Sequence, residues 1–300
     1  MTVFATAASN PPPFLEPASV AVPFAESICV LVLVQALLVA LPAPREIAAL
    51  GRLRSGWWAL IPAGSVVAFV FGVRALGGAA EGLTYLALVA VPPLAALALA
   101  WLMRGARASY AAAALLLFAL AWADRAGLAG QAAGVILDAL SCVALAVLLV
   151  AVTPPRLVKL AIIAMAAADA WLVIANLLTA PNNSLNAIAP VAHLPQLQRV
   201  QLDAAVMGYG DLFIAALLGA LLARAAQLQR RAALLAAVLA LLANLLFFFV
   251  DELPATVPIA LTLIVIETAA WRTRRRAGER MSGERQRLSA VLEPAKRDRG

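Results

Sequence analysis

The sequence contains few charged residues and almost no histidine or cysteine, and these shortages argue against several classes of protein. Only 13% of the 300 residues are charged, whereas soluble globular domains average roughly a quarter. One histidine, His193, and two distant cysteines, Cys29 and Cys142, cannot supply a usual zinc site or a disulfide framework. The HExxH motif of zinc peptidases and the GxSxG motif of serine hydrolases are also absent. The sequence therefore predicts no metal site and no cofactor.

Long apolar stretches make up most of the chain: 64% of the residues are hydrophobic and the mean hydropathy is +0.93. Long apolar blocks separated by short polar stretches are typical of multi-pass helical membrane proteins. We therefore predict an all-α polytopic membrane protein, with one transmembrane bundle over residues 1–271 and a basic tail over 272–300. The predicted bundle has nine spans, at about residues 22–42, 57–75, 82–103, 109–122, 133–153, 157–179, 203–223, 231–250 and 255–271.

Arginine and lysine are concentrated in alternate loops and in the tail. If every second loop is cytoplasmic, those loops hold ten Arg and Lys residues, and the outer loops and span ends hold three. Positively charged loops stay on the cytoplasmic side of a membrane. We therefore predict an outer N-terminus, a cytoplasmic C-terminus, and an outer loop at about 180–202 whose prolines and asparagines disfavour helix.

The basic tail is predicted to fix this topology in the cytoplasm. Residues 272–300 contain ten Arg and Lys against four Asp and Glu. No aromatic residues interleave these basic ones, so we expect a solvated segment and no binding to nucleic acid. The bias toward Ala, Leu and Arg is typical of a GC-rich prokaryotic genome, so the predicted location is a prokaryotic plasma membrane.

Five acidic residues fall in the interior of the predicted spans, and an ionised carboxylate at the centre of a bilayer costs on the order of 3 kcal/mol. Glu26, Asp138 and Glu267 lie near span ends, where snorkelling or a local polar contact explains them. Asp169 and Asp211 lie deeper, roughly 15 Å and 12 Å from the outer face at about 1.5 Å per residue. Because consecutive spans are antiparallel, we expect these two carboxylates to meet.

Two carboxylates that share one site cannot both ionise cheaply, so such a pair holds a single proton. One partner then acts as a general base on water while the other, protonated, polarises a carbonyl group. This is the chemistry of aspartyl proteases, and it needs neither a metal nor a nucleophilic side chain. A structural hydrogen-bonded acid pair and a proton or ion relay are alternatives that depth and spacing leave open.

Two glycines, Gly208 and Gly210, flank Tyr209 directly before Asp211. Glycine permits close approach of backbones and loosens local helical geometry. A loosened, strand-like segment here could pair with an unfolding substrate by β-augmentation. A protease inside a membrane needs such pairing, because a helical substrate hides its peptide bonds in its own hydrogen bonds.

These motifs occur in an order that resembles a known family. Asp169 lies in "AADAWLVIAN" of span six, Gly208, Gly210 and Asp211 in "MGYGDLFIAALL" of span seven, and Pro254 and Ala255 in "ELPATVPIALTL" before span nine. The chain is similar to the GxGD intramembrane aspartyl proteases, the presenilin and signal-peptide-peptidase family, convincingly over about residues 157–271. The resemblance implies nine spans, a catalytic pair formed by Asp169 and Asp211, an active-site motif at 208–210 and a substrate gate at Pro254, Ala255 and Thr256.

The resemblance also implies transmembrane-helix peptides as substrates, without requiring a protein partner. The chain departs from the family at Ala168, where Tyr is usual, and at Thr256, where Leu is usual. One alternative is the type IV prepilin peptidase group, but Leu212-Phe213 does not match its GxGDxK motif. The other is a proton-coupled membrane transporter, which would explain paired intramembrane acids and a broken helix near Pro254. A transporter predicts inverted repeats, and none is evident in the sequence.

Overall fold

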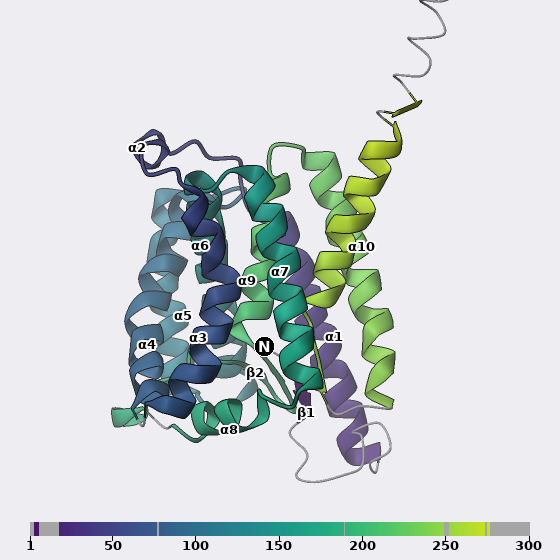
Figure 1. The fold of residues 1–300 in the computed structure, drawn as a ribbon. Coiled ribbons are helices and arrows are strands. Elements are labelled where there is room, and N and C mark those ends of the chain that lie inside the picture. Colours follow the sequence, from purple (N-terminus) through teal and green to yellow (C-terminus); the bar gives the residue numbers. More distant parts are fainter. Residues whose placement is uncertain are drawn as a thin grey trace, which may run out of the picture.

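The computed structural model describes residues 3–5, 18–76, 78–188, 190–248, 252–273 and 275–276. This part of the chain is mainly helical, and a small antiparallel sheet lies among the helices (Figure 1). The helices are α1 (Ala18–Ala40), α2 (Ala48–Gly51), α3 (Ile61–Ala75), α4 (Ala79–Leu97), α5 (Ala111–Ala123), α6 (Leu128–Val152), α7 (Pro155–Ile174), α8 (Thr179–Ala187), α9 (Tyr209–Leu222), α10 (Ala226–Asn244) and a final one over 257–273. The strands are β1 (Val3–Ala5), β2 (Val200–Leu202), β3 (Ala205–Met207) and β4 (Glu252–Leu253).

The helices have the length, composition and outer surface of membrane-spanning segments. Large apolar side chains face outward from the bundle; Ile174 and Trp57, for example, are 85% and 79% exposed. A surface of this kind is stable only where lipid covers it. Five helices in the described part are long and apolar enough to cross a membrane: Gly56–Ala75, Ala79–Leu102, Leu128–Val152, Pro155–Ile174 and Ala226–Asn244. The chain is therefore a mainly helical membrane protein, while the count of nine spans stays a prediction, because Phe24–Ala40, Ala108–Ala123 and Tyr209–Leu222 are shorter.

The predicted span over 203–223 is wrong in its first six residues. Residues 205–207 form strand β3, which makes an antiparallel hairpin with β2, and helix α9 begins only at Tyr209. The turn of the hairpin contains Asp203, whose φ is 48° and whose N–H donates a 2.6 Å hydrogen bond to Gln131 Oε1. Over so short a run, hydrophobicity cannot distinguish a buried strand from the start of a helix.

The predicted outer loop over 180–202 is also more regular than expected, because it contains helix α8. Pro181 is the third residue of this helix, where a backbone N–H has no intrahelical partner, so proline is tolerated there. Leu185 of α8 is buried, and the helix packs against α3 and α4. Helix α8 therefore closes one end of the bundle (Figure 1).

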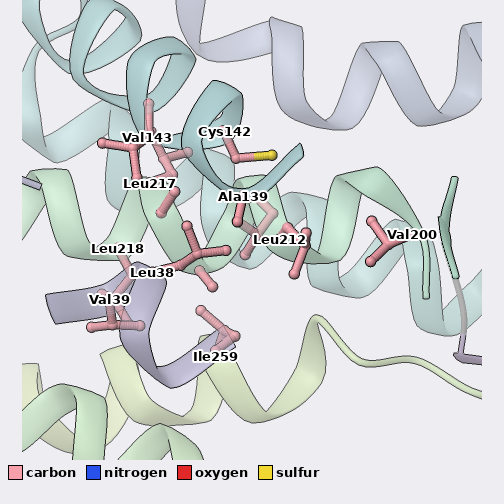
Figure 2. Packing of buried hydrophobic residues seen from close by; sticks show 14 of the residues in the cluster. Leu38, Val39, Ala139, Cys142, Val143, Val200, Leu212, Leu217, Leu218 and Ile259 are labelled. Carbon is pink, nitrogen blue, oxygen red and sulfur yellow. The ribbon is translucent and has the colours of Figure 1, made fainter. Parts of the chain in front are cut away.

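Helices α6 and α9 form the centre of the bundle. Ten of the fourteen residues of α9 are buried, and α9 packs against α6, α1 and α7. Because lipid is as apolar as the side chains, close packing rather than hydrophobic burial holds such helices together. Figure 2 shows this packing around Leu38, Val39, Ala139, Cys142, Val143, Val200, Leu212, Leu217, Leu218 and Ile259.

Gly219 allows the backbones of α1 and α9 to meet. A Cβ atom at this position would lie 2.5 Å from the carbonyl oxygen of Val39 and 2.7 Å from that of Leu38. The same end of α9 is fixed by Gln229, whose amide donates hydrogen bonds to the carbonyl oxygens of Gly219 and Pro42. Arg104 completes the network by donating to Gln229 Oε1 and to the carbonyl of Ala223. Glycine at 219 is therefore a requirement of helix packing.

The loops that the charge count assigns to one side of the membrane lie together at one end of the bundle. Backbone hydrogen bonds join Ala43 to Leu102 and Ser55 to Val152, at 3.0 Å and 2.9 Å. Arg224, after α9, forms an ion pair with Glu46 at 2.8 Å. Helix α8 and the sheet lie toward the opposite end (Figure 1). Which end faces the cytoplasm stays a prediction from the loop charges.

We predict that Gly219→Ala destabilises the bundle, because the added methyl group must push α1 away from α9. Overpacking of this kind costs about 1–3 kcal/mol, although alanine is intrinsically the better helix former by about 1 kcal/mol. Thermal unfolding in detergent should show a lower midpoint for this variant. Gly64→Ala in α3 is the matched control, since nothing lies within 4 Å of its added Cβ, and it should unfold at or above the wild-type midpoint.

Candidate active site

Asp211 is the third residue of helix α9 and is completely buried. Its backbone N–H donates to the carbonyl of Gly208 at 3.0 Å, and its Oδ2 atom accepts a 3.1 Å hydrogen bond from the N–H of Gly208. A carboxylate in the first turn satisfies an otherwise free backbone donor and complements the positive end of the helix dipole. The predicted span over 203–223 would place Asp211 well inside a helix, and this is corrected: Asp211 lies in the first turn of α9, shortly after strand β3.

Asp169, in the second half of α7, is likewise completely buried. Its Oδ2 atom accepts a 2.7 Å hydrogen bond from the hydroxyl of Thr256. Helices α7 and α9 pack against each other, and the carboxylates of Asp169 and Asp211 are close enough to interact electrostatically. The fold thus brings together the two acids whose similar predicted depths led us to expect that they meet.

One carboxylate oxygen of this pair has no hydrogen-bond partner within the described ranges. Asp211 Oδ1 is buried and accepts no hydrogen bond from any described residue. Leaving a buried charged acceptor unpaired costs about 1–3 kcal/mol or more. A water molecule or a ligand satisfies a buried acceptor of this kind in most proteins.

The segment that contains Pro254, Ala255 and Thr256 connects strand β4 to the helix over 257–273. Pro254 and Ala255 are half-buried, and Thr256 is completely buried. The sequence predicts these three residues as a gate at the mouth of the site. Thr256 differs from a residue that only lines the mouth, because its hydroxyl donates a hydrogen bond directly to the carboxylate of Asp169.

Gln35 of α1 belongs to the site, and sequence reasoning missed it. Its side-chain Nε2 donates to the backbone carbonyls of Asp211 and Ala255, at 3.3 Å and 3.2 Å. Gln35 therefore ties the first turn of α9 to the segment before the final helix. The available signal was one amide inside the apolar run "LVLVQALLVA", since polar side chains within membrane helices usually join neighbouring helices.

Asp138 of α6 is a third buried acid near the site, and the explanation by snorkelling is wrong for it. Its side chain is 1% exposed, and Oδ1 has no partner among the described residues. Ser141 donates to the carbonyl of Asp138 at 2.7 Å and shares a 2.7 Å hydrogen bond with the hydroxyl of Tyr209. Distance from the span end failed here because α6 begins at Leu128, five residues before the predicted span, so Asp138 is the eleventh of its 25 residues and lies inside the bundle.

The other two acids near predicted span ends, Glu26 and Glu267, have the exposure or the local polar contact expected there. Glu26 is exposed on α1. Glu267 forms a 2.6 Å ion pair with Lys159, and both side chains remain partly exposed. Neither acid contributes to the buried pair.

A large apolar cavity of about 700 Å³ reaches the residues that precede Asp211. It lies between α3, α4, α6 and α7, and Tyr209 and Gly210 form part of its wall. Met165, one helical turn before Asp169, also lines it. Other lining residues include Phe69, Val91, Leu149 and Phe213. Because its lining is almost entirely apolar, the cavity suits an apolar ligand.

No family model, curated protein or solved structure matches this chain. Within the described ranges, no group of three or more His, Cys, Asp or Glu side chains could hold a metal ion. The chemistry of the site must therefore be inferred from its own residues: two interacting carboxylates, one acceptor oxygen that no described residue binds, and an adjacent apolar cavity.

We predict that Gln35→Met destabilises the site, because methionine has a similar shape but donates no hydrogen bond to the carbonyls of Asp211 and Ala255. The expected loss of unfolding free energy is about 1–3 kcal/mol, measured as a lower thermal midpoint in detergent. Gln227→Met is the matched control, since Gln227 is exposed on α10. Equal midpoints for the two variants would show that the Gln35 hydrogen bonds contribute nothing.

Proposed function

We propose that this chain is an intramembrane aspartyl endopeptidase of the GxGD type, similar to the presenilin and signal-peptide-peptidase family. The observation that carries the proposal is the pair formed by Asp169 and Asp211. Two carboxylates are fully buried on neighbouring helices of a membrane protein and interact with each other, and one of their oxygens has no partner among the described residues. A purely structural acid pair would gain stability by saturating that oxygen.

The hydrolysis needs one proton shared between the two carboxyl groups. The ionised carboxylate takes a proton from water while the water oxygen bonds to the peptide carbonyl carbon. The protonated carboxyl group donates its proton to the carbonyl oxygen, which gives a neutral tetrahedral diol. As the carbon–nitrogen bond breaks, the first group returns its proton to the nitrogen and the second recovers a proton from a diol hydroxyl. We assign the contact with water to Asp211 Oδ1, the unpartnered oxygen.

The neighbouring strands suit a substrate that must leave its helical conformation. A peptide bond within a helix is engaged in the helix's own hydrogen bonds, so it has to unfold locally before water can attack it. Strand β3 leads through Gly208 directly into the turn that holds Asp211. A peptide paired with β3 would therefore present extended backbone beside the carboxylates, while its remaining helix occupies the apolar cavity.

We predict that Asp169→Asn and Asp211→Asn each lower cleavage at least about 100-fold, because neither amide can exchange protons with water or the carbonyl. Folding should persist, since each replacement removes a buried charge. The measurement is mass spectrometry of a single-span peptide after incubation with the purified protein in proteoliposomes. Glu26→Gln, which alters an exposed acid, is the matched control and should cleave like wild type.

Cleavage that persists in either asparagine variant would exclude the proposed pair. A wild-type protein that cleaves no peptide, but moves protons across vesicle membranes in a manner that Asp169→Asn abolishes, would favour the transporter alternative.

We also predict that substrates have their N-terminus on the arginine-rich side, which the loop charges assign to the cytoplasm. Strand β3 runs toward Asp211, so an antiparallel partner runs away from the carboxylates and toward the end of the bundle at α8. The test presents one peptide in both orientations to enzyme of uniform orientation in vesicles. Preferential cleavage of the peptide whose N-terminus is outside would contradict the predicted substrate orientation. A reporter fused after Gly300 that is active only outside the cell would overturn the predicted topology of the protein itself.

A further inference from the structure

The N-terminal strand β1 lies between two strands that lead into the candidate site. The sheet has the order β2-β3-β1-β4, and β1 is antiparallel to both neighbours. Phe4 is opposite Val206 of β3 on one edge and Glu252 of β4 on the other. Both edges of β1 are therefore occupied, and the sheet continues from β3 to β4 only through this segment of chain.

The two strands beside β1 lead to opposite halves of the site. Strand β3 ends at Met207, one residue before Gly208, whose N–H binds the carboxylate of Asp211. Strand β4 ends at Leu253, three residues before Thr256, whose hydroxyl binds Asp169. The space between β3 and β4 is therefore the position from which an extended backbone would reach both carboxylates.

We propose that β1 is an internal competitor of the substrate, which holds the site closed until a substrate strand displaces it; this rests on the proposed protease function. Each backbone N–H and C=O on one edge of β3 can pair with one partner strand at a time. A substrate strand on that edge must therefore use the groups that β1 now uses. Strand β1 also has the direction inferred for the substrate, because its amino end lies toward Met207 and hence toward the Asp211 turn.

The competition is weak enough to be reversed. Strand β1 has only three residues, whereas strands in stable sheets usually have about five or six. Its advantage is that it belongs to the same chain, which gives an effective concentration on the order of millimolar. A substrate concentrated in the same bilayer and pairing over a longer stretch can displace it, so β1 would select against peptides that pair poorly with β3.

The test compares Phe4→Pro with Phe4→Val. Proline has no N–H and is excluded from the interior of a sheet, so Phe4→Pro should release β1, whereas valine keeps the backbone donor and should retain it. Cleavage of a single-span peptide in proteoliposomes should show KM about 5–10-fold lower for Phe4→Pro, with kcat unchanged. A tenfold change in KM corresponds to about 1.4 kcal/mol of competition. A peptide with the sequence of residues 1–8 should raise KM again, and a scrambled peptide should not.

Hydrogen exchange separates this proposal from the protease function, because it needs no catalysis. The amides of residues 205–207 and 252–253 should exchange faster in Phe4→Pro than in Phe4→Val. Equal exchange in the two variants would overturn the competitor, as would faster exchange accompanied by unchanged KM; in both cases the protease function stands. Faster exchange in a protein that cleaves no peptide in any variant would overturn the protease function and, with it, the competition.

Discussion

A carboxylate enclosed by protein and lipid requires hydrogen-bond donors close by, and the centre of this bundle is arranged around that requirement. Asp211 obtains a donor by lying in the first turn of α9, where the N–H of Gly208 is available. Asp169 lies within a continuous helix, whose backbone donors are already used, so its donor is the hydroxyl of Thr256 from a distant segment. Gln35 then fixes the two donor segments to each other.

This requirement explains why regular helix stops near the pair. Asp211 has to lie at the depth of Asp169 to meet it, and in the first turn of α9 to accept a hydrogen bond from the N–H of Gly208. Helix α9 therefore begins at this depth, and the residues before it cannot be helical. They form the β2–β3 hairpin, whose backbone groups pair within the hairpin and with β1. The final helix begins at residue 257 for the same reason, since Thr256 must turn toward Asp169. Non-helical backbone at this depth is tolerated because protein surrounds it.

The sequence predicts the helical membrane fold and the pairing of Asp169 with Asp211 because both depend on long apolar runs and on residue spacing along a helix. It does not predict contacts that depend on three-dimensional neighbours. Gln35 is 176 residues from Asp211, and no local pattern indicates which backbone carbonyl an intramembrane amide will bind. Asp138 shows a related failure: its place in the sequence indicated a span end, but α6 begins at Leu128, and the packing of this helix covers Asp138 with protein. The hairpin was missed because three-residue strands have no periodicity to detect.

The contact at Gly219 determines where this protein can open. Helices α1 and α9 meet with no side chain between them, and Gln35 joins the same two helices at the other end of α9. The two helices are therefore joined at both ends of α9. The apolar cavity that reaches Tyr209 and Gly210 has most of its lining residues on other helices, among them α3 and α7, and none of them belongs to α1. A molecule in the bilayer would then enter sideways, between helices, and water would need a separate route.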